Sequence, residues 1–333
     1  CVLSPADPSS TSHATIALMI GTNTALGNLR VWCGAARWLA TLLAVALGGC
    51  ADLFFATVGG VGSAQGVNAT KGIEFDAAHR LSLDVYAPNR AALAPVVVFF
   101  YGGSWEDGKR RWYRYVGDAL AGNGVVTIIP DYRKYPDVRF PAFMYDAANA
   151  VAWARDHARE FGGDPQRLFV MGHSAGGQIG ALLAADGRYL GQVGMHPRDL
   201  SGMIGVAGAY AFLPFVDNEE KIFGNDATGR YDSQPINFIS GDEPPMLLLQ
   251  GDDDDEVPLH NAQLMAERAQ AMDGTAQLKI YPGVGHSAIL LSFARGHASQ
   301  VPALRDTLAF IAHPPAARES AAGDEAPLPP PRR

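Results

Sequence analysis

The periodicity of hydrophobic residues changes along this chain. Residues 71–75 and 81–86 are short strand-like segments on either side of a polar turn at residues 76–79, which predicts a β-hairpin. Continuous apolar runs follow, at residues 95–101, 125–129, 168–171 and 246–249. Runs of this kind, rich in β-branched residues, are typical of strands that are buried on both faces of a parallel sheet.

Helical segments separate these apolar runs, at residues 111–121, 144–161, 175–185 and 259–272. Because strand and helix alternate, we predict an α/β fold in which a mostly parallel central sheet carries helices on both faces. Residues 209–243 break the pattern, since aromatic and apolar side chains stand there among Pro, Gly and acidic residues. We expect this segment to form a small cap inserted over the site.

The two ends of the chain differ from this middle part. Residues 51–70 are Gly, Ala and Val with little periodicity, and we interpret them as a tether. Residues 314–333 carry six prolines with alternating charge, which predicts a disordered tail. We therefore place one domain at residues 71–313, with residues 1–50 as a separate signal region.

The signal region has the order of a secretory leader. Arg30 and Arg37 precede an apolar run at residues 38–47, which has about half the ~20 residues that a membrane-spanning helix needs. Residues 47–50 (LGGC) resemble a bacterial lipobox, in which Cys50 becomes the lipidated first residue of the mature protein. The alternative is an ordinary signal peptide in which Cys50 is incidental. Both predict export, as an envelope lipoprotein tethered to the membrane or as a secreted or periplasmic protein.

The beginning of the chain supports a separate expectation. The chain starts with Cys1, and residues 1–28 are rich in Ser, Thr, Ala and Asn with only a short apolar patch. We interpret this part as a non-native N-terminal extension, with Met19 as the candidate start.

Composition narrows the classes of function. The 333 residues, 48% of them hydrophobic, suffice for one large core. A net charge of −8 and scattered Lys and Arg residues leave no basic stripe for nucleic acid, so we expect no nucleic-acid partner. The three cysteines, Cys1, Cys33 and Cys50, all precede the domain, which therefore has no disulfide, thiolate metal site or catalytic thiol. We expect neither a cofactor nor a metal.

Ser174 is the candidate nucleophile. It lies in a G-x-S-x-G motif, residues 172–176 (GHSAG), between the apolar run 168–171 and the helical segment 175–185. This strand-turn-helix setting makes the motif specific, because a tight turn there forces the serine into a strained conformation and leaves room only for glycine two residues before and after it. The alternative is a Gly-rich turn with an incidental serine.

A serine nucleophile needs a base near neutral pKa and an acid that fixes the tautomer of the base. His286 ends a Gly-rich loop after the strand-like residues 277–281, and that loop could bring its imidazole to Ser174. His173, His196, His260 and His297 compete for this role. Carboxylates for the acid are available after the run 246–249, where Asp252 to Asp255 follow one another with Glu256 behind them. Part of this acidic run must be exposed to solvent. Cation binding by the run is a weaker alternative, because its residues lack the ligand spacing of an EF-hand loop.

Through these motifs the chain resembles the hormone-sensitive-lipase-like branch of the α/β hydrolases. It resembles more closely the small carboxylesterases, arylformamidases and isoprenylcysteine methylesterases. The matching stretches are YGGSW at residues 101–105, PDYR at 130–133, FGGDPQRLFVMGHSAGG at 161–177, LLLQGDDDDEVP at 247–258 and YPGVGH at 281–286. The resemblance implies the α/β-hydrolase fold with a triad in the order Ser, Asp, His. The family spacing G-x-x-D-x-x-V fits Gly251, Asp254 and Val257, which selects Asp254 and leaves Asp253 and Asp255 as alternatives.

The same resemblance assigns an oxyanion hole to residues 101–105. It implies donors from the backbone N–H groups of Gly103, Ser104 and Ala175, although Tyr101 and Ser104 stand where the family has His and its third Gly. It also implies that residues 131–133 brace this loop. Trp105 would wall the substrate pocket or pack in the core.

The predicted function is therefore that of a serine carboxylic-ester hydrolase, acting on small esters through an acyl-enzyme and without a cofactor. Two alternatives stay open. The first is amide or formamide hydrolysis by the same triad, and the second is a non-catalytic binding protein of the same fold. The sequence does not determine the oligomeric state.

Overall fold

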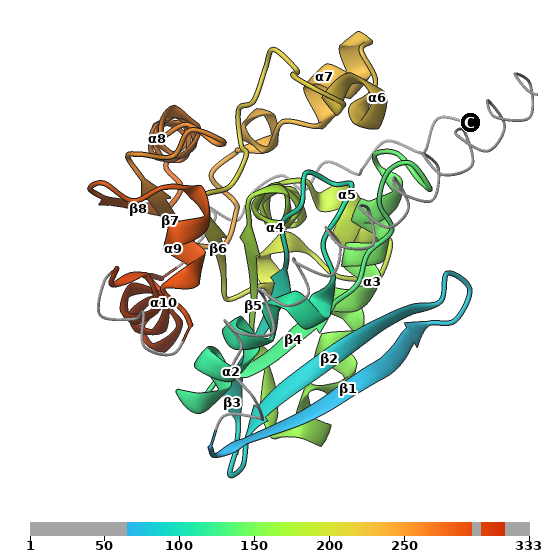
Figure 1. Cartoon of the computed structure of the whole chain (residues 1–333), viewed down its shortest axis with the longest axis vertical. Coiled ribbons are helices and arrows are strands. Elements are labelled where there is room, and N and C mark those ends of the chain that lie inside the picture. Colours follow the sequence, from blue (N-terminus) through green and yellow to red (C-terminus); the bar gives the residue numbers. More distant parts are fainter. Residues whose placement is uncertain (1–64, 295–300, 317–333) are drawn as a thin grey trace, which may run out of the picture. The chain divides into compact units, whose positions relative to one another are not determined.

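An eight-stranded sheet forms the centre of the domain (Figure 1). The computed structural model describes residues 65–294 and 301–316. The strands are β1 (Val67–Asp76), β2 (Leu81–Pro88), β3 (Ala94–Phe100), β4 (Val126–Pro130), β5 (Gly163–His173), β6 (Gly202–Val206), β7 (Met246–Gly251) and β8 (Ala276–Tyr281). Their order in the sheet is β1-β2-β4-β3-β5-β6-β7-β8. The pairs β1–β2 and β2–β4 are antiparallel, and all other pairs are parallel.

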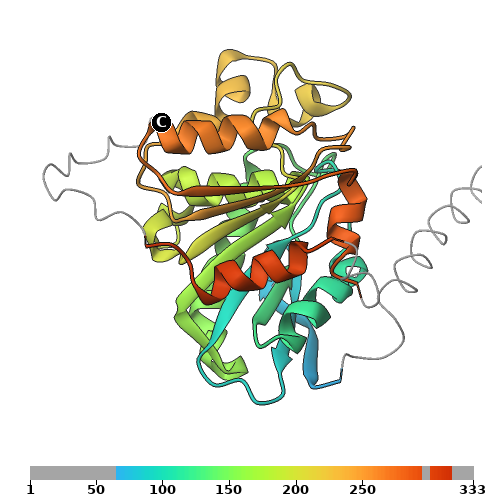
Figure 2. The ribbon, with the colours of Figure 1, turned by 90° about the vertical axis from the view of Figure 1, so that its left-hand side faces the viewer.

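Helices cover both faces of this sheet. They are α2 (Arg114–Gly122), α3 (Ala142–His157), α4 (Ala175–Ala185), α5 (Gly187–Gly191), α6 (Glu219–Phe223), α7 (Ala227–Asp232), α8 (His260–Ala271), α9 (His286–Leu291) and α10 (Ala303–Ala312). Short 3-10 turns are η1 (Arg110–Tyr113), η2 (Ala158–Phe161), η3 (Pro197–Asp199) and η4 (Pro235–Phe238). Helix α3 packs beside α4, and α2 beside α10, while Figure 2 shows α8 (orange) and α10 (red) on opposite sides of the sheet. The predicted α/β-hydrolase architecture is confirmed.

The hydrophobic pattern follows from this layering. Residues 96–100 of β3 are fully buried because helices cover both faces of the central strands. At the edge of the sheet, β8 has exposed and half-buried positions, and only Tyr281 is buried. The runs that the sequence shows as continuous are therefore the strands inside the sheet.

The structure corrects the predicted secondary structure at three places. Strand β1 begins at Val67, so residues 67–70 belong to the sheet and not to the tether, because they pair with β2 as far as Pro88. Strand β6 was not predicted, since Gly202 and Gly205 interrupt its apolar run. The segments 111–121 and 144–161 are each divided into a 3-10 turn and an α-helix.

The carboxyl ends of the parallel strands meet at one edge of the sheet. Strands β3, β5 and β7 lead there to residues 101–105, to Ser174 and to Asp254, and β8 leads to His286. In open α/β sheets this edge is where ligands bind. The segment between β6 and β7, residues 207–245, contains α6, α7 and η4 and includes residues 209–243, for which the sequence predicts a cap.

The signal region and most of the tether lie outside the described residues, as does the greater part of the C-terminal tail. Among the helices that the structure describes, none combines the length and the apolar character needed to cross a membrane.

Candidate active site

Ser174 occupies a strained turn between β5 and α4. Its backbone has φ 54° and ψ −123°, a conformation that non-glycine residues avoid. A Cβ at Gly172 would lie 2.0 Å from the carbonyl oxygen of Gly176, and one at Gly176 would lie 2.0 Å from that of Phe100. The two glycines of the motif are thus required by close backbone packing, as the sequence predicts.

Asp254 and His286 form a buried pair. The two carboxylate oxygens of Asp254 lie 3.1 and 2.9 Å from Nδ1 of His286. The same carboxylate accepts hydrogen bonds from the backbone N–H groups of Glu256 and Val257, at 3.1 and 2.8 Å. The structure therefore brings Asp254 to His286, whereas Asp253 and Asp255 are exposed.

These contacts keep Asp254 ionised. Burial raises the pKa of Asp254, but the hydrogen bonds from His286 and Val257 and the charge of His286 outweigh burial and hold this pKa below its usual range. A carboxylate bound at Nδ1 keeps the proton on that nitrogen and leaves Nε2 as the basic atom of the imidazole. His286 is the first residue of α9, so the Gly-rich loop ends one residue before it.

His173 links this pair to the nucleophile turn. Its ring lies 4.7 Å, centroid to centroid, from the ring of His286, and its Nε2 lies 3.2 Å from the backbone oxygen of His286. Burial, with the charge of His286 beside it, lowers the pKa of His173 to about 3. His173 is the residue before Ser174. In its neutral form it therefore holds the first turn of α9 against the turn that carries Ser174. Among the described residues, Ser174 Oγ has no hydrogen-bond partner, so its bond to His286 stays a prediction.

The Gly-rich loop after β3 lies against the nucleophile. A Cβ at Gly102 would lie 3.0 Å from the Cβ of Ser174. Within the described part of the chain, the backbone N–H groups of Gly103, Ser104 and Ala175 donate to no protein acceptor. Donors without a protein acceptor are what an oxyanion hole requires, and the role of these three groups stays a prediction.

Tyr101 stands where the family has His, and it points into a bracing network. Its hydroxyl donates to Oδ1 of Asp131 at 3.0 Å, and the hydroxyl of Tyr132 donates to the backbone oxygen of Tyr101 at 2.8 Å. Arg133 in turn binds the buried carboxylate of Asp146. The Tyr101 proton is thus engaged with Asp131, and Asp131 and Tyr132 contact the loop as the resemblance implies, whereas Arg133 binds helix α3.

Trp105 is buried in an aromatic cluster with the cap. Its ring stacks on Phe212 at a centroid distance of 5.5 Å and meets the edge of Phe223 at 4.8 Å. Its Nε1 donates to Oε1 of Gln178 at 3.1 Å. With 4% of its surface exposed, Trp105 packs in the core beneath the cap, so its predicted contact with substrate stays a prediction.

Sequence reasoning missed two glutamines of this region. Gln250 is fully buried at the end of β7, and its Nε2 donates to Asp254 at 2.8 Å and to the backbone oxygen of Val257 at 2.9 Å. Gln178 is fully buried in α4. A lone amide inside an otherwise apolar run was the available signal for both.

One group of potential metal ligands lies elsewhere in the described residues. Carboxylate and imidazole atoms of Asp76, His79 and Asp146 lie within 4.8 Å of one another. Arg133 already occupies the Asp146 carboxylate, with Nη2 at 2.6 Å from Oδ1. A cation there would have to compete with this guanidinium, and the group is not connected with the acidic run at residues 252–255.

Several known proteins are similar to this chain in sequence. The BD-FAE family matches residues 83–209. A probable isoprenylcysteine α-carbonyl methylesterase of Arabidopsis thaliana is 27% identical, over 64% of this chain and 49% of its own length. The esterase LipC of Mycobacterium tuberculosis is 32% identical, over 61% of this chain and 55% of its own. The chain thus spans about half the length of the curated relatives it matches.

Solved structures share the fold. The thermophilic esterase Est2 of Thermogutta terrifontis superposes with a TM-score of 0.58 at 25% identity, covering 74% of this chain and 90% of that one. An inhibited esterase B from Lactobacillus rhamnosis has a TM-score of 0.69 at 20% identity, with 84% and 95% covered. The second likeness concerns the fold alone.

Proposed function

We propose that this chain, which belongs to the α/β-hydrolase fold, is a serine hydrolase that cleaves small carboxylic esters through an acyl-enzyme. The buried Asp254–His286 pair, held against the strained turn of Ser174, is the observation that carries the proposal. The names of the relatives support it, because those named above are esterases. Est2 has also been solved with bound propionate, with bound butyrate and phosphorylated by paraoxon, which supports a small acyl group and a nucleophilic centre here.

The reaction would begin at Ser174. Its Oγ attacks the ester carbonyl carbon while Nε2 of His286 takes the hydroxyl proton. Asp254 stabilises the imidazolium that forms, because its lowered pKa keeps it charged. The N–H groups of Gly103, Ser104 and Ala175 would bind the oxyanion, each donor being worth about 2.7–4 kcal/mol in comparable sites.

The tetrahedral intermediate then collapses. The C–O bond to the alcohol breaks, and the alcohol leaves with the proton from His286. Water, deprotonated by His286, attacks the acyl-Ser174 ester, and the carboxylic acid leaves as Ser174 recovers its proton. No step requires a cofactor.

The test uses p-nitrophenyl esters of increasing acyl length and a fluorophosphonate probe, with the wild type and a Ser174→Ala variant. We expect the wild type to hydrolyse short esters and to be labelled, and the variant to do neither. An aryl formamide assayed in parallel distinguishes ester hydrolysis from amide hydrolysis. A higher kcat/KM on the formamide than on the esters would favour amide hydrolysis. A wild type that is silent in every assay would favour the binding protein.

We also infer that the protein is exported and lipidated at Cys50. The order of Arg37, the apolar run 38–47 and the LGGC segment supports this proposal. Expression in a bacterial host with an alkyne fatty acid should label the wild type in the membrane fraction, whereas Cys50→Ser should be unlabelled. Equal labelling of both proteins would contradict lipidation at this residue, and retention in the cytoplasm would contradict export.

A further inference from the structure

Gln178 connects the oxyanion loop to the cap. It lies on α4, four residues after Ser174, and its side chain is fully buried. Its Oε1 accepts a hydrogen bond from Nε1 of Trp105 at 3.1 Å, and its Nε2 donates to the backbone oxygen of Ser233 at 2.9 Å. An amide that uses its acceptor on one side and its donor on the other has a single favourable orientation, because a flip would face donor to donor and acceptor to acceptor.

The contacts of Gln178 belong to a closed circuit. From Ser233 the circuit continues to Gln234, whose Nε2 donates to Oγ of Ser233 at 2.8 Å. Oε1 of Gln234 accepts from the backbone N–H of Phe212 at 2.7 Å, and the ring of Phe212 stacks on Trp105. Each of these groups is thus fixed from two sides, which stabilises buried polar networks.

The loop that this circuit holds is strained. Ser104 and Trp105 have φ values of 51° and 58°, in the left-handed region that non-glycine residues avoid. Such conformations are costly in free energy and persist only where neighbouring contacts determine them. Trp105 follows Ser104 directly in the chain, so a shift of its indole would disturb the peptide groups of Gly103 and Ser104, to which the resemblance assigns the oxyanion hole.

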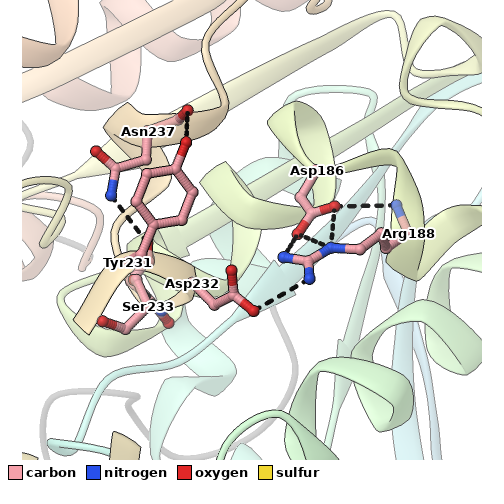
Figure 3. A network of polar contacts seen from close by, with 7 residues as sticks. Asp186, Arg188, Tyr231, Asp232, Ser233 and Asn237 are labelled. Atoms are coloured by element: carbon pink, nitrogen blue, oxygen red, sulfur yellow. Dashed lines mark hydrogen bonds and ion pairs between the residues drawn. The ribbon is translucent and has the colours of Figure 1, made fainter. Parts of the chain in front are cut away.

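The cap side of the circuit is also anchored. Ser233 directly follows α7, and Asp232 at the end of α7 accepts from Nη1 of Arg188 at 3.1 Å (Figure 3). The guanidinium of Arg188 also binds Asp186, the buried residue after α4, with Nη2 at 2.7 Å. The acceptor that Gln178 uses on the cap is therefore held in place independently of Gln178.

We propose that Gln178 is a positioning residue that fixes the oxyanion loop through Trp105 and couples its geometry to the cap. This inference rests on the ester hydrolysis proposed above. Gln178 touches neither substrate nor reacting atoms in this proposal. It acts by aligning the N–H groups of Gly103 and Ser104 with the developing oxyanion, and this alignment affects the transition state more than the bound ester.

The test compares Gln178→Met, which keeps the length of the side chain but removes both hydrogen bonds, with Ile179→Ala. Ile179 is the next residue of α4 and is equally buried, so its variant is a matched control for lost stability. On p-nitrophenyl acetate, we expect Gln178→Met to lower kcat roughly 10- to 100-fold with little change in KM, and to weaken a trifluoromethyl-ketone inhibitor by the same factor. Ile179→Ala should lower Tm and leave kcat unchanged.

Trp105→Phe supplies a second arm, because it keeps an aromatic ring against Phe212 while it removes the indole N–H together with part of the ring system. We expect it to lower kcat, and the double variant with Gln178→Met to be no slower than the slower single variant. Additive effects, or a wild-type kcat in folded Trp105→Phe, would overturn the proposal even if Gln178→Met failed to fold. A Gln178→Met variant whose kcat falls no more than that of Ile179→Ala would also overturn the proposal. A wild type inactive on esters and unlabelled by fluorophosphonate would instead refute the ester hydrolase, and the positioning role with it.

Discussion

The Ser174 turn and the Asp254–His286 pair lie at the same edge of the sheet but are held by different forces. The turn is held by backbone packing so close that a single Cβ at Gly172 or Gly176 would overlap a carbonyl oxygen. The pair is held by side-chain and backbone hydrogen bonds from Gln250, Val257 and His286 to one carboxylate. Substitutions of the two turn glycines should therefore disturb the fold, whereas substitutions in the pair should disturb chemistry and leave the fold intact.

Gly176→Ala should have the largest effect. The new Cβ would lie 2.0 Å from the backbone oxygen of Phe100, and no side-chain rotation can relieve a backbone clash. We expect a loss of about 3 kcal/mol or more in the free energy of unfolding, together with loss of esterase activity. Urea unfolding measures the first and p-nitrophenyl acetate hydrolysis the second. A stable and active Gly176→Ala would break the steric account of the turn.

Asp254→Asn should remove activity without removing the fold. An amide at this position no longer stabilises the imidazolium or fixes its tautomer, and kcat should fall by about 10⁴-fold. Asp253→Asn is the matched control, since Asp253 is exposed one residue away. Circular dichroism should show both variants folded. A large loss in Asp253→Asn with an active Asp254→Asn would exchange their roles.

His173, which joins the two regions, should make stability depend on pH. Its pKa is about 3 in the folded state, against about 6.5 in an unfolded chain, so the unfolded state binds a proton first as pH falls. The contribution of His173 to folding stability should be fully present above pH 6.5 and should be lost on acidification by up to about 1.4 kcal/mol per pH unit. Urea unfolding between pH 7 and pH 4.5 should show a flatter dependence for His173→Gln. Parallel curves for the two proteins would refute the assignment of this slope to His173.

Asp232→Asn, outside both regions, should have the smallest effect. It weakens the bond between the cap and Arg188, whose side chain is 53% exposed, and partly exposed ion pairs contribute about 1 kcal/mol or less. We expect Tm to fall by about 2–4 °C at most, with kcat on p-nitrophenyl acetate unchanged, because Gln178 still binds Ser233. Thermal unfolding and steady-state kinetics test both statements. A large loss of kcat would mean that the cap is held by Asp232 more than by the buried circuit.

The sequence predicted what depends on neighbours along the chain. Continuous apolar runs are enough to indicate parallel strands, and the glycines around Ser174 indicate a turn in which a Cβ has no room. Local patterns did not predict the beginning of β1 or the strand β6. Residues 67–70 become a strand only because β2 extends far enough to pair with them, and the glycines of β6 hide an apolar run.

The tertiary structure alone decided which polar groups meet. Four aspartates in a row have the same side chain, and only the resemblance to a family spacing selected Asp254 from the sequence. The fold buries Asp254 against His286 while its neighbours stay in solvent. Gln178 lies 73 residues from Trp105 and 55 from Ser233, distances over which no local pattern carries information. Hydrophobic periodicity and turn motifs are local properties of a sequence, whereas a hydrogen bond between distant side chains exists only after the strands and the segment between β6 and β7 have been placed.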